Sequence, residues 1–121
     1  MAELRAKFKL WLELDDQPLL GEGGYALLRA IDEEGSIMAA CRRLELSYRK
    51  AMYYLRKLEK RLGRKVVEAH RGGRGGGEAR LTADGKALVE AYRAVREALE
   101  AALADVAPKV LSGLELQAQA P

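Results

Sequence analysis

The feature that most constrains the fold is a pair of capped amphipathic helices within residues 36–63, separated by a very short turn. Ser36 is a good N-cap for a helix over residues 37–44, and Ser47 caps a second that runs to Gly63, a typical helix terminator. Apolar residues recur at helical spacing in both, so each helix has one face to bury. Two helices joined by a turn of three or four residues, the second strongly basic, match the helix-turn-helix pattern.

The segments on either side of this pair predict two further elements before it and a hairpin after it. Residues 4–14 alternate between apolar and mostly charged side chains, which is typical of a half-buried strand. A turn with several glycines then leads into a helix from Tyr25 that closes at Gly35. After the helix pair, residues 65–69 and 79–82 predict two strands with a glycine-rich, arginine-bearing tip, which we interpret as a wing.

The last predicted element is a long helix over residues 82–107, capped by Thr82 and stopped by Pro108. A helix of about 25 residues outside a compact core needs a partner helix, so we expect it to dimerise. Residues 108–121 have no strong period, and we expect a disordered tail there. The residues expected at the dimer interface are Trp11, Leu88, Tyr92, Val95, Leu99, Ala102 and Val106.

Together these patterns predict a mainly α fold with a small β component. The predicted architecture is a winged helix-turn-helix with an N-terminal strand and a long C-terminal dimerisation helix, in one domain over residues 1–107. A chain of 121 residues, 49 % apolar and 32 % charged, suits one domain and leaves little room for two.

The charge is unevenly distributed along the chain. The net charge is only +3, but residues 42–80 hold 13 basic and 4 acidic side chains, a net charge of +9, and the remainder has a net charge of −6. A basic middle third between acidic flanks is typical of a polyanion-binding surface. The alternative from charge alone is a solvated helix face.

Several classes of protein are excluded or made unlikely by the composition. The N-terminus scatters charges where a signal peptide would be apolar, and no long uncharged apolar stretch could span a membrane. The single Cys41 and single His70 cannot form a disulfide or a four-ligand zinc site within the chain, which fits a reducing cytoplasm. No catalytic arrangement is anchored to a pocket, so we predict no enzyme and no cofactor or metal. Cys41 is most simply a core residue, with redox sensing as the alternative.

The basic helix has one face to pack and one face free to contact a ligand. With 100° per residue, its apolar residues gather opposite Arg49, whose guanidinium can pair in bidentate fashion with guanine. We expect four residues near its N-terminus to read base edges: Tyr48, Arg49, Met52 and Tyr53. We expect the caps, the later helical turns and the wing to contact phosphates through Ser36, Ser47, Lys50, Arg56, Lys57, Lys60, Arg71, Arg74 and Arg80.

Three alternatives stay open at this point. Met52 and Tyr53 could pack against the domain instead of contacting thymine methyl groups. Ser36 and Ser47 could serve as N-caps alone, without a phosphate. The whole chain could be a protein-interaction module that dimerises through its long helix and does not read DNA, although that leaves the glycine-arginine wing without a role.

Three stretches of sequence carry a family resemblance. They are Gly35-Ser36-Ile37, Ser47-Tyr48-Arg49-Lys50-Ala51, and Gly72-Gly73-Arg74-Gly75-Gly76-Gly77 followed by Leu81-Thr82 and Gly85. Over residues 3–105 the chain resembles the DNA-binding domain of the ModE family of molybdate-responsive transcriptional regulators. The stretches 58–63 and 81–85 are also similar to LysR-type regulators. The resemblance implies a homodimeric DNA-binding regulator on a palindromic operator, linked to molybdate or oxyanion transport genes.

The chain departs from the ModE pattern in two respects. The family has two molybdate-binding modules after the long helix, which the 121 residues do not include. Two alternatives follow for a stand-alone DNA-binding member of the family: it is constitutive, or it depends on a separate molybdate-binding protein. Glu45 stands where the family commonly has a glycine, and we therefore expect a turn conformation that is open to ordinary residues.

Overall fold

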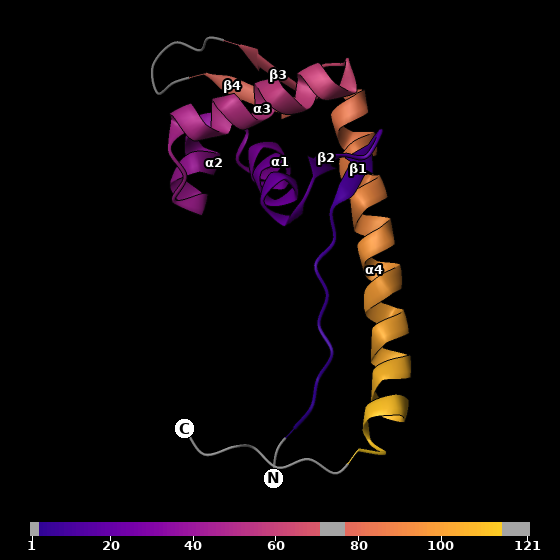
Figure 1. Cartoon of the computed structure of the whole chain (residues 1–121). Coiled ribbons are helices and arrows are strands. Elements are labelled where there is room, and N and C mark those ends of the chain that lie inside the picture. Colours follow the sequence, from indigo (N-terminus) through magenta and orange to yellow (C-terminus); the bar gives the residue numbers. More distant parts are fainter. Residues whose placement is uncertain (1–2, 71–76, 115–121) are drawn as a thin grey trace.

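A computed structural model of the chain describes residues 3–70 and 77–114. Three helices and two small hairpins form a compact head, and a fourth helix projects from it (Figure 1). The elements are β1 (Leu12–Leu14), β2 (Gln17–Leu20), α1 (Glu22–Glu34), α2 (Ile37–Leu44), α3 (Tyr48–Leu62), β3 (Val67–His70), β4 (Glu78–Leu81) and α4 (Ala83–Leu111). The predicted fold class, a winged helix-turn-helix with a long C-terminal helix, is confirmed.

The core lies between α1 and the elements that surround it. The buried apolar residues of α1 meet α2 on one side and β4 and the start of α4 on another, and α2 packs in turn against α3. Cys41 is one of these core residues, as predicted, and burial raises the pKa of its thiol. The core residues are Leu20, Tyr25, Leu27, Leu28, Ala30, Ile31, Ile37, Ala40, Cys41, Ala51, Leu55, Leu58, Val66, Val67, Ala79, Leu81 and Tyr92.

The helix-turn-helix is capped as predicted. The Ser36 and Ser47 hydroxyls each accept a hydrogen bond from a backbone N–H three residues on, at 3.1 Å. Gly35 and Gly63 close α1 and α3 in the left-handed conformation. The prediction for Glu45 is wrong, because it also adopts a left-handed conformation, with φ 54° and ψ 41°. The turn needs this geometry so that the N–H of the next residue can bond back to α2.

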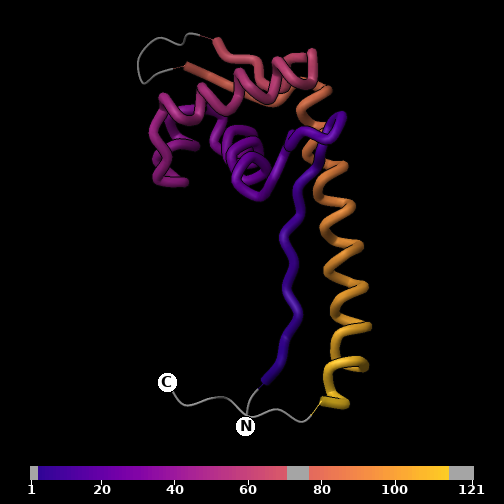
Figure 2. The backbone as a smooth tube through the Cα atoms, viewed as in Figure 1, coloured from indigo at the N-terminus to yellow at the C-terminus, as the bar shows by residue number. Residues whose placement is uncertain are grey.

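The N-terminal strand is much shorter than the prediction for residues 4–14. Pairing starts at Leu12, and β1 forms a hairpin with β2, which the alternating pattern did not predict. Asp15 and Asp16, both with positive φ, make the two-residue turn between them. Residues 3–11, here called the arm, run beside α4 instead of another strand (Figure 2). The alternation gives the arm one apolar face, but no strand within residues 3–70 and 77–114 supplies the hydrogen bonds that a sheet requires there.

The first helix begins earlier than predicted, at Glu22, so that two of the glycines assigned to a turn lie in its first turn. Gly24 is needed there because a β-carbon would overlap the ring of Tyr54, coming within 2.8 Å of its Cε1. This close approach brings α3 against α1, and the Tyr54 hydroxyl donates a hydrogen bond to the Leu19 carbonyl at 3.4 Å.

The wing hairpin is confirmed as an antiparallel pair, β3 with β4. The Thr82 N–H bonds to the Val66 carbonyl at the base of the hairpin, and further along β4 the Ala79 N–H bonds to the Gly35 carbonyl at the end of α1, both at 2.9 Å. Thr82 also caps α4 by accepting from the Gly85 N–H at 3.0 Å. The tip residues 71–76, with Arg71 and Arg74, lie outside the described residues.

The long helix continues past the predicted stop, through Pro108 to Leu111. A proline this close to the C-terminal end removes one hydrogen bond of the last turns and leaves the rest of the helix intact. The predicted disordered tail over residues 108–121 is therefore wrong for its first four residues, and residues 115–121 lie outside the described residues. No helix in the described part of the chain is long and apolar enough to cross a membrane.

Tyr92 does not lie at an exposed dimer face. Its side chain is 0 % exposed and stacks on Tyr25, with ring centroids 4.5 Å apart. Helical spacing places it on the apolar stripe of α4, but that stripe is covered by the chain's own head at this level. The prediction that Tyr92 contacts a second subunit is therefore wrong.

Candidate nucleic-acid interface

α3 runs across the upper part of the head, beside β3 and β4 (Figure 1). Ala51, Leu55 and Leu58 are buried on the inner face, which fixes the rotation of the helix about its axis. The predicted cationic residues of α3 are consequently all exposed. They are Arg49, Lys50, Arg56, Lys57 and Lys60.

None of these five cations has a carboxylate partner among the described residues, whereas most basic residues outside α3 do. Elsewhere the basic residues are largely paired. Arg43 contacts Glu33 at 2.9 Å and Glu34 at 3.3 Å, and this guanidinium lowers the pKa of Glu33. The basic residues in ion pairs are Arg5, Arg29, Arg43, Arg64, Arg80, Arg93, Arg96 and Lys109. The α3 face thus presents positive charge that the protein itself leaves uncompensated, which is the arrangement a polyanion requires.

The structure separates the two apolar candidates for base contact. Tyr53 is 67 % exposed and points away from the head, and Tyr48 is 49 % exposed at the start of α3. Met52 is half-buried and packs against the core. Met52 therefore packs against the domain, which was one of the two alternatives for this pair. Tyr53 stays exposed at the surface, where it is available for a base contact.

Ser36 and Ser47 both serve as N-caps, as the bonds above show. Each hydroxyl uses an acceptor position for its cap, so its hydrogen stays free to be donated. A contact from either to a phosphate stays a prediction.

The wing residues are less uniformly available. Arg80 lies on the outer face of β4 opposite Glu68, and its Nε is 3.5 Å from that carboxylate. Both side chains are largely exposed, so this pair is worth little and can open toward another anion.

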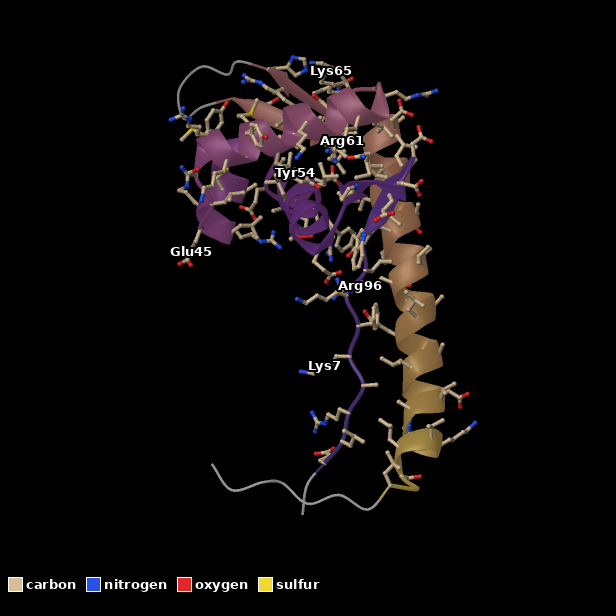
Figure 3. The ribbon with its side chains drawn as sticks, viewed as in Figure 1. Lys7, Glu45, Tyr54, Arg61, Lys65 and Arg96 are labelled. Carbon is tan, nitrogen blue, oxygen red and sulfur yellow. The ribbon has the colours of Figure 1, made fainter. Side chains whose placement is uncertain are left out.

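Three α3 residues that position this face were not singled out by their pattern. Glu59 accepts hydrogen bonds from the N–H groups of Val66 (2.8 Å) and Val67 (3.2 Å), which attaches α3 to the wing. Tyr54 and Arg61 donate to carbonyls of the β2 segment, and Figure 3 shows both on the side of α3 that faces it. Glu59 is the only acidic residue in a basic helix, and this could have indicated that its carboxylate contacts another part of the protein and not a ligand.

The predicted interface residues of α4 lie mostly on the part of the helix beyond the head. Val95, Leu99 and Val106 are between 42 % and 51 % exposed, and Ala102 is exposed on the same side. Leu88 is half-buried against the core. Trp11 is 55 % exposed on the β1 side, where its indole N–H donates to Glu13 at 2.8 Å.

Comparison with known proteins decides the family. Residues 25–86, more than half of the chain, match the family described as bacterial regulatory helix-turn-helix protein, lysR family. The chain belongs to this family. The matched range begins in α1, includes the helix-turn-helix and the wing hairpin, and ends in the first turn of α4. The chain therefore carries the DNA-binding helix-turn-helix of a bacterial transcriptional regulator, and the family is not one of enzymes.

Similar curated proteins agree with the ModE resemblance. The chain is 36 % identical over 108 residues to the molybdenum-pterin-binding protein MopB of Rhodobacter capsulatus, covering 84 % of this chain and 40 % of MopB. It is 30 % identical over 120 residues to the molybdenum transport protein ModE of Azotobacter vinelandii, covering 98 % of this chain and 44 % of ModE. The chain thus spans about two-fifths of the length of these relatives.

A solved structure gives the same fold. ArgP from Mycobacterium tuberculosis matches with a TM-score of 0.51 and 26 % sequence identity. The match covers 67 % of this chain and 28 % of ArgP.

Proposed function

We propose that this chain binds double-stranded DNA in a sequence-specific manner as a homodimer on a palindromic operator. The observation that carries the proposal is the exposed face of α3, where five cations have no carboxylate partner among the described residues. A helix of 15 residues is about 22 Å long and fits lengthwise in a major groove about 12 Å wide.

On this proposal, the two ends of α3 have different tasks. Arg49 and Tyr53, in the first two turns, read base edges, and Arg49 pairs with a guanine. Arg56, Lys57 and Lys60 lie further along and contact phosphates, which adds affinity without sequence preference. The wing arginines Arg71, Arg74 and Arg80 contact the backbone or the minor groove beside it.

The proposed dimer is supported by the part of α4 beyond the head. There the exposed side of the helix carries Val95, Leu99, Ala102 and Val106 instead of charges, and so large an apolar stripe needs a cover. We propose that the same stripe of a second copy covers it, which sets two α3 helices about 34 Å apart in successive major grooves.

The test of DNA recognition starts from duplexes selected for binding in vitro. Arg49→Ala should lose about 1–3 kcal/mol of discrimination at one base position, and Lys57→Ala should weaken all duplexes alike and reduce the salt slope by about one. Lys7→Ala is the matched control, since it removes one positive charge on the arm, far from α3 (Figure 3). If affinity is insensitive to salt between about 50 and 200 mM, the chain is a protein-interaction module instead.

The test of the dimer compares two variants of α4, each of which introduces one carboxylate, one on the apolar stripe and one on another face of the helix. Val106→Glu should give monomers in sedimentation, because it puts a carboxylate in the middle of the apolar stripe. Ala101→Glu, about 140° round the helix axis, adds the same charge outside the stripe and should leave the dimer intact. A Val106→Glu protein that stays dimeric would remove this face from the interface.

The names of the relatives suggest the regulated genes. We propose operators beside molybdate or oxyanion transport genes, and a separate molybdate-binding protein that delivers the signal to this chain. A regulator of bacterial genes acts where the chromosome is, so the proposed location is the cytoplasm.

If a separate protein delivers the signal, molybdate alone should leave the DNA affinity of residues 1–121 unchanged, whereas molybdate with the binding protein should change it. A direct effect of molybdate alone would contradict the need for that partner.

A further inference from the structure

Tyr92 stands where three elements meet. Its ring stacks on Tyr25 of α1, with an interplanar angle of 26°, and its hydroxyl lies between the backbone carbonyl of Leu10 in the arm, at 2.8 Å, and the carboxylate of Glu22 at the start of α1. Glu22 also contacts Arg96, one turn further along α4, at 3.4 Å. One buried side chain therefore connects the arm, α1 and α4.

This junction is also the last point at which α4 is buried in the head. Leu88 and Val89 pack against the core, Tyr92 is fully buried, and Val95 is already 43 % exposed. Figure 3 shows Arg96 at the level where α4 leaves the head. Beyond it, the arm lines a groove along the helix, with Phe8 on one wall and Leu103 on the other.

Because the junction lies where α4 leaves the head, a small change in the angle there moves the far end of α4 by a large distance relative to the head. The 19 residues of α4 that follow Tyr92 extend over about 28 Å. A change of about 10° between the head and α4 therefore moves the far end by about 5 Å, which exceeds the rise of one base pair, about 3.4 Å.

We propose that Tyr92 is a positioning residue that determines which half-site spacing the dimer accepts. This inference rests on the proposed function, because a spacing exists only if two copies bind one operator. In such a dimer, assembled through α4, the angle between head and α4 sets the distance between the two α3 helices. The Tyr92 hydroxyl has one proton to donate and both of its partners are acceptors, so it holds that angle by sharing this proton between the Leu10 carbonyl of the arm and the Glu22 carboxylate of α1. It contacts no base.

The experiment compares operators whose two half-sites are separated by different numbers of base pairs. Tyr92→Phe keeps the ring and its stacking and removes the hydroxyl. The wild-type chain should prefer its selected spacing by about tenfold over spacings changed by one or two base pairs, and Tyr92→Phe should reduce that preference to about threefold or less. Affinity for a single half-site, which a general loss of structure would lower, should not change. An unchanged spacing preference in Tyr92→Phe would overturn the proposal.

A matched control is available in the same stack. Tyr25→Phe removes a hydroxyl that makes no hydrogen bond within the described residues, and leaves the two rings in contact. Its spacing preference should equal that of the wild type. An equal loss of preference in both variants would assign the effect to packing and contradict the role of the Tyr92 hydroxyl.

A second measurement needs no DNA and so separates this inference from the proposed function. Spin labels on Lys65→Cys, in a Cys41→Ala background, report the distance between the two heads of a dimer; Lys65 is exposed beside the wing (Figure 3). The distance distribution should be narrow in the labelled protein that keeps Tyr92, and it should broaden by about 5 Å or more when Tyr92→Phe is added. Identical distributions, or a chain that stays monomeric, would overturn the proposal even if DNA binding is confirmed.

Discussion

Gly85, in the first turn of α4, tests whether the wing and α4 are joined as tightly as the structure indicates. A β-carbon at this position would overlap the carbonyl oxygen of Val66 and lie 3.0 Å from its carbonyl carbon. These are backbone atoms held by the wing base, so they cannot rotate away as a side chain could. Gly85→Ala must therefore separate α4 from the base of β3.

The cost of that separation can be worked out from the bonds it would break. Moving α4 outward lengthens the hydrogen bond from the Thr82 N–H to the Val66 carbonyl, now 2.9 Å, and the bond from the Thr82 hydroxyl to the Lys65 carbonyl, now 2.7 Å. Overpacking costs about 1–3 kcal/mol and a buried bond left unmade a similar amount. The better helix propensity of alanine offsets at most about 1 kcal/mol. The net expectation is a loss of about 1–6 kcal/mol in the free energy of unfolding.

Urea unfolding of two glycine variants provides the assay. Gly23 is the matched control, because it lies in the first turn of α1 and a β-carbon there meets nothing within 4 Å. Gly23→Ala should leave the stability unchanged or raise it by up to about 1 kcal/mol. Should Gly85→Ala prove as stable as Gly23→Ala, α4 and the base of the wing would not be in the close contact that this prediction requires.

Three further predictions concern the turn, the α3 anchor and alkaline pH. Glu45→Gly should stabilise the protein by about 0.5–1 kcal/mol, because glycine adopts the left-handed conformation of the turn without steric cost; a destabilised variant would contradict the φ of 54°. Glu59→Ala should cost about 1–3 kcal/mol in urea unfolding, since it leaves the N–H groups of Val66 and Val67 without their acceptor, and an unchanged stability would mean that water replaces the carboxylate. Burial and the nearby carboxylate raise the pKa of Tyr92, so the folded state keeps a proton that the unfolded chain loses above about pH 10. Stability should therefore fall as the pH rises above that value, and the fall should be smaller in Tyr92→Phe.

The parts of the fold that the sequence predicted are those that local chemistry determines. Ser36, Ser47, Thr82 and Gly63 cap their helices because their side chains or backbone freedom satisfy groups within three or four residues. The outward face of α3 follows in the same way from the spacing of its apolar residues. These signals do not depend on distant parts of the chain.

The parts that could not be predicted depend on what lies across from a residue in space. The alternation in residues 4–14 shows that the segment has two faces, but not that α4 lies beside it in place of a strand. The apolar stripe of α4 includes Tyr92 and Val95 alike, although the head covers one and leaves the other exposed. For the same reason Glu59 could be seen as unusual in α3, but its bonds to the wing could not be foreseen.

We propose that the face of α3 from Tyr48 to Lys60 is the surface that binds DNA. Amide chemical-shift mapping on addition of a selected duplex tests it residue by residue, without any substitution. We expect large changes along α3 and at the N-terminus of α2, and none along the outer part of α4 from Glu97 to Leu111. Changes confined to α1 or α4, with α3 unaffected at saturating duplex, would contradict it.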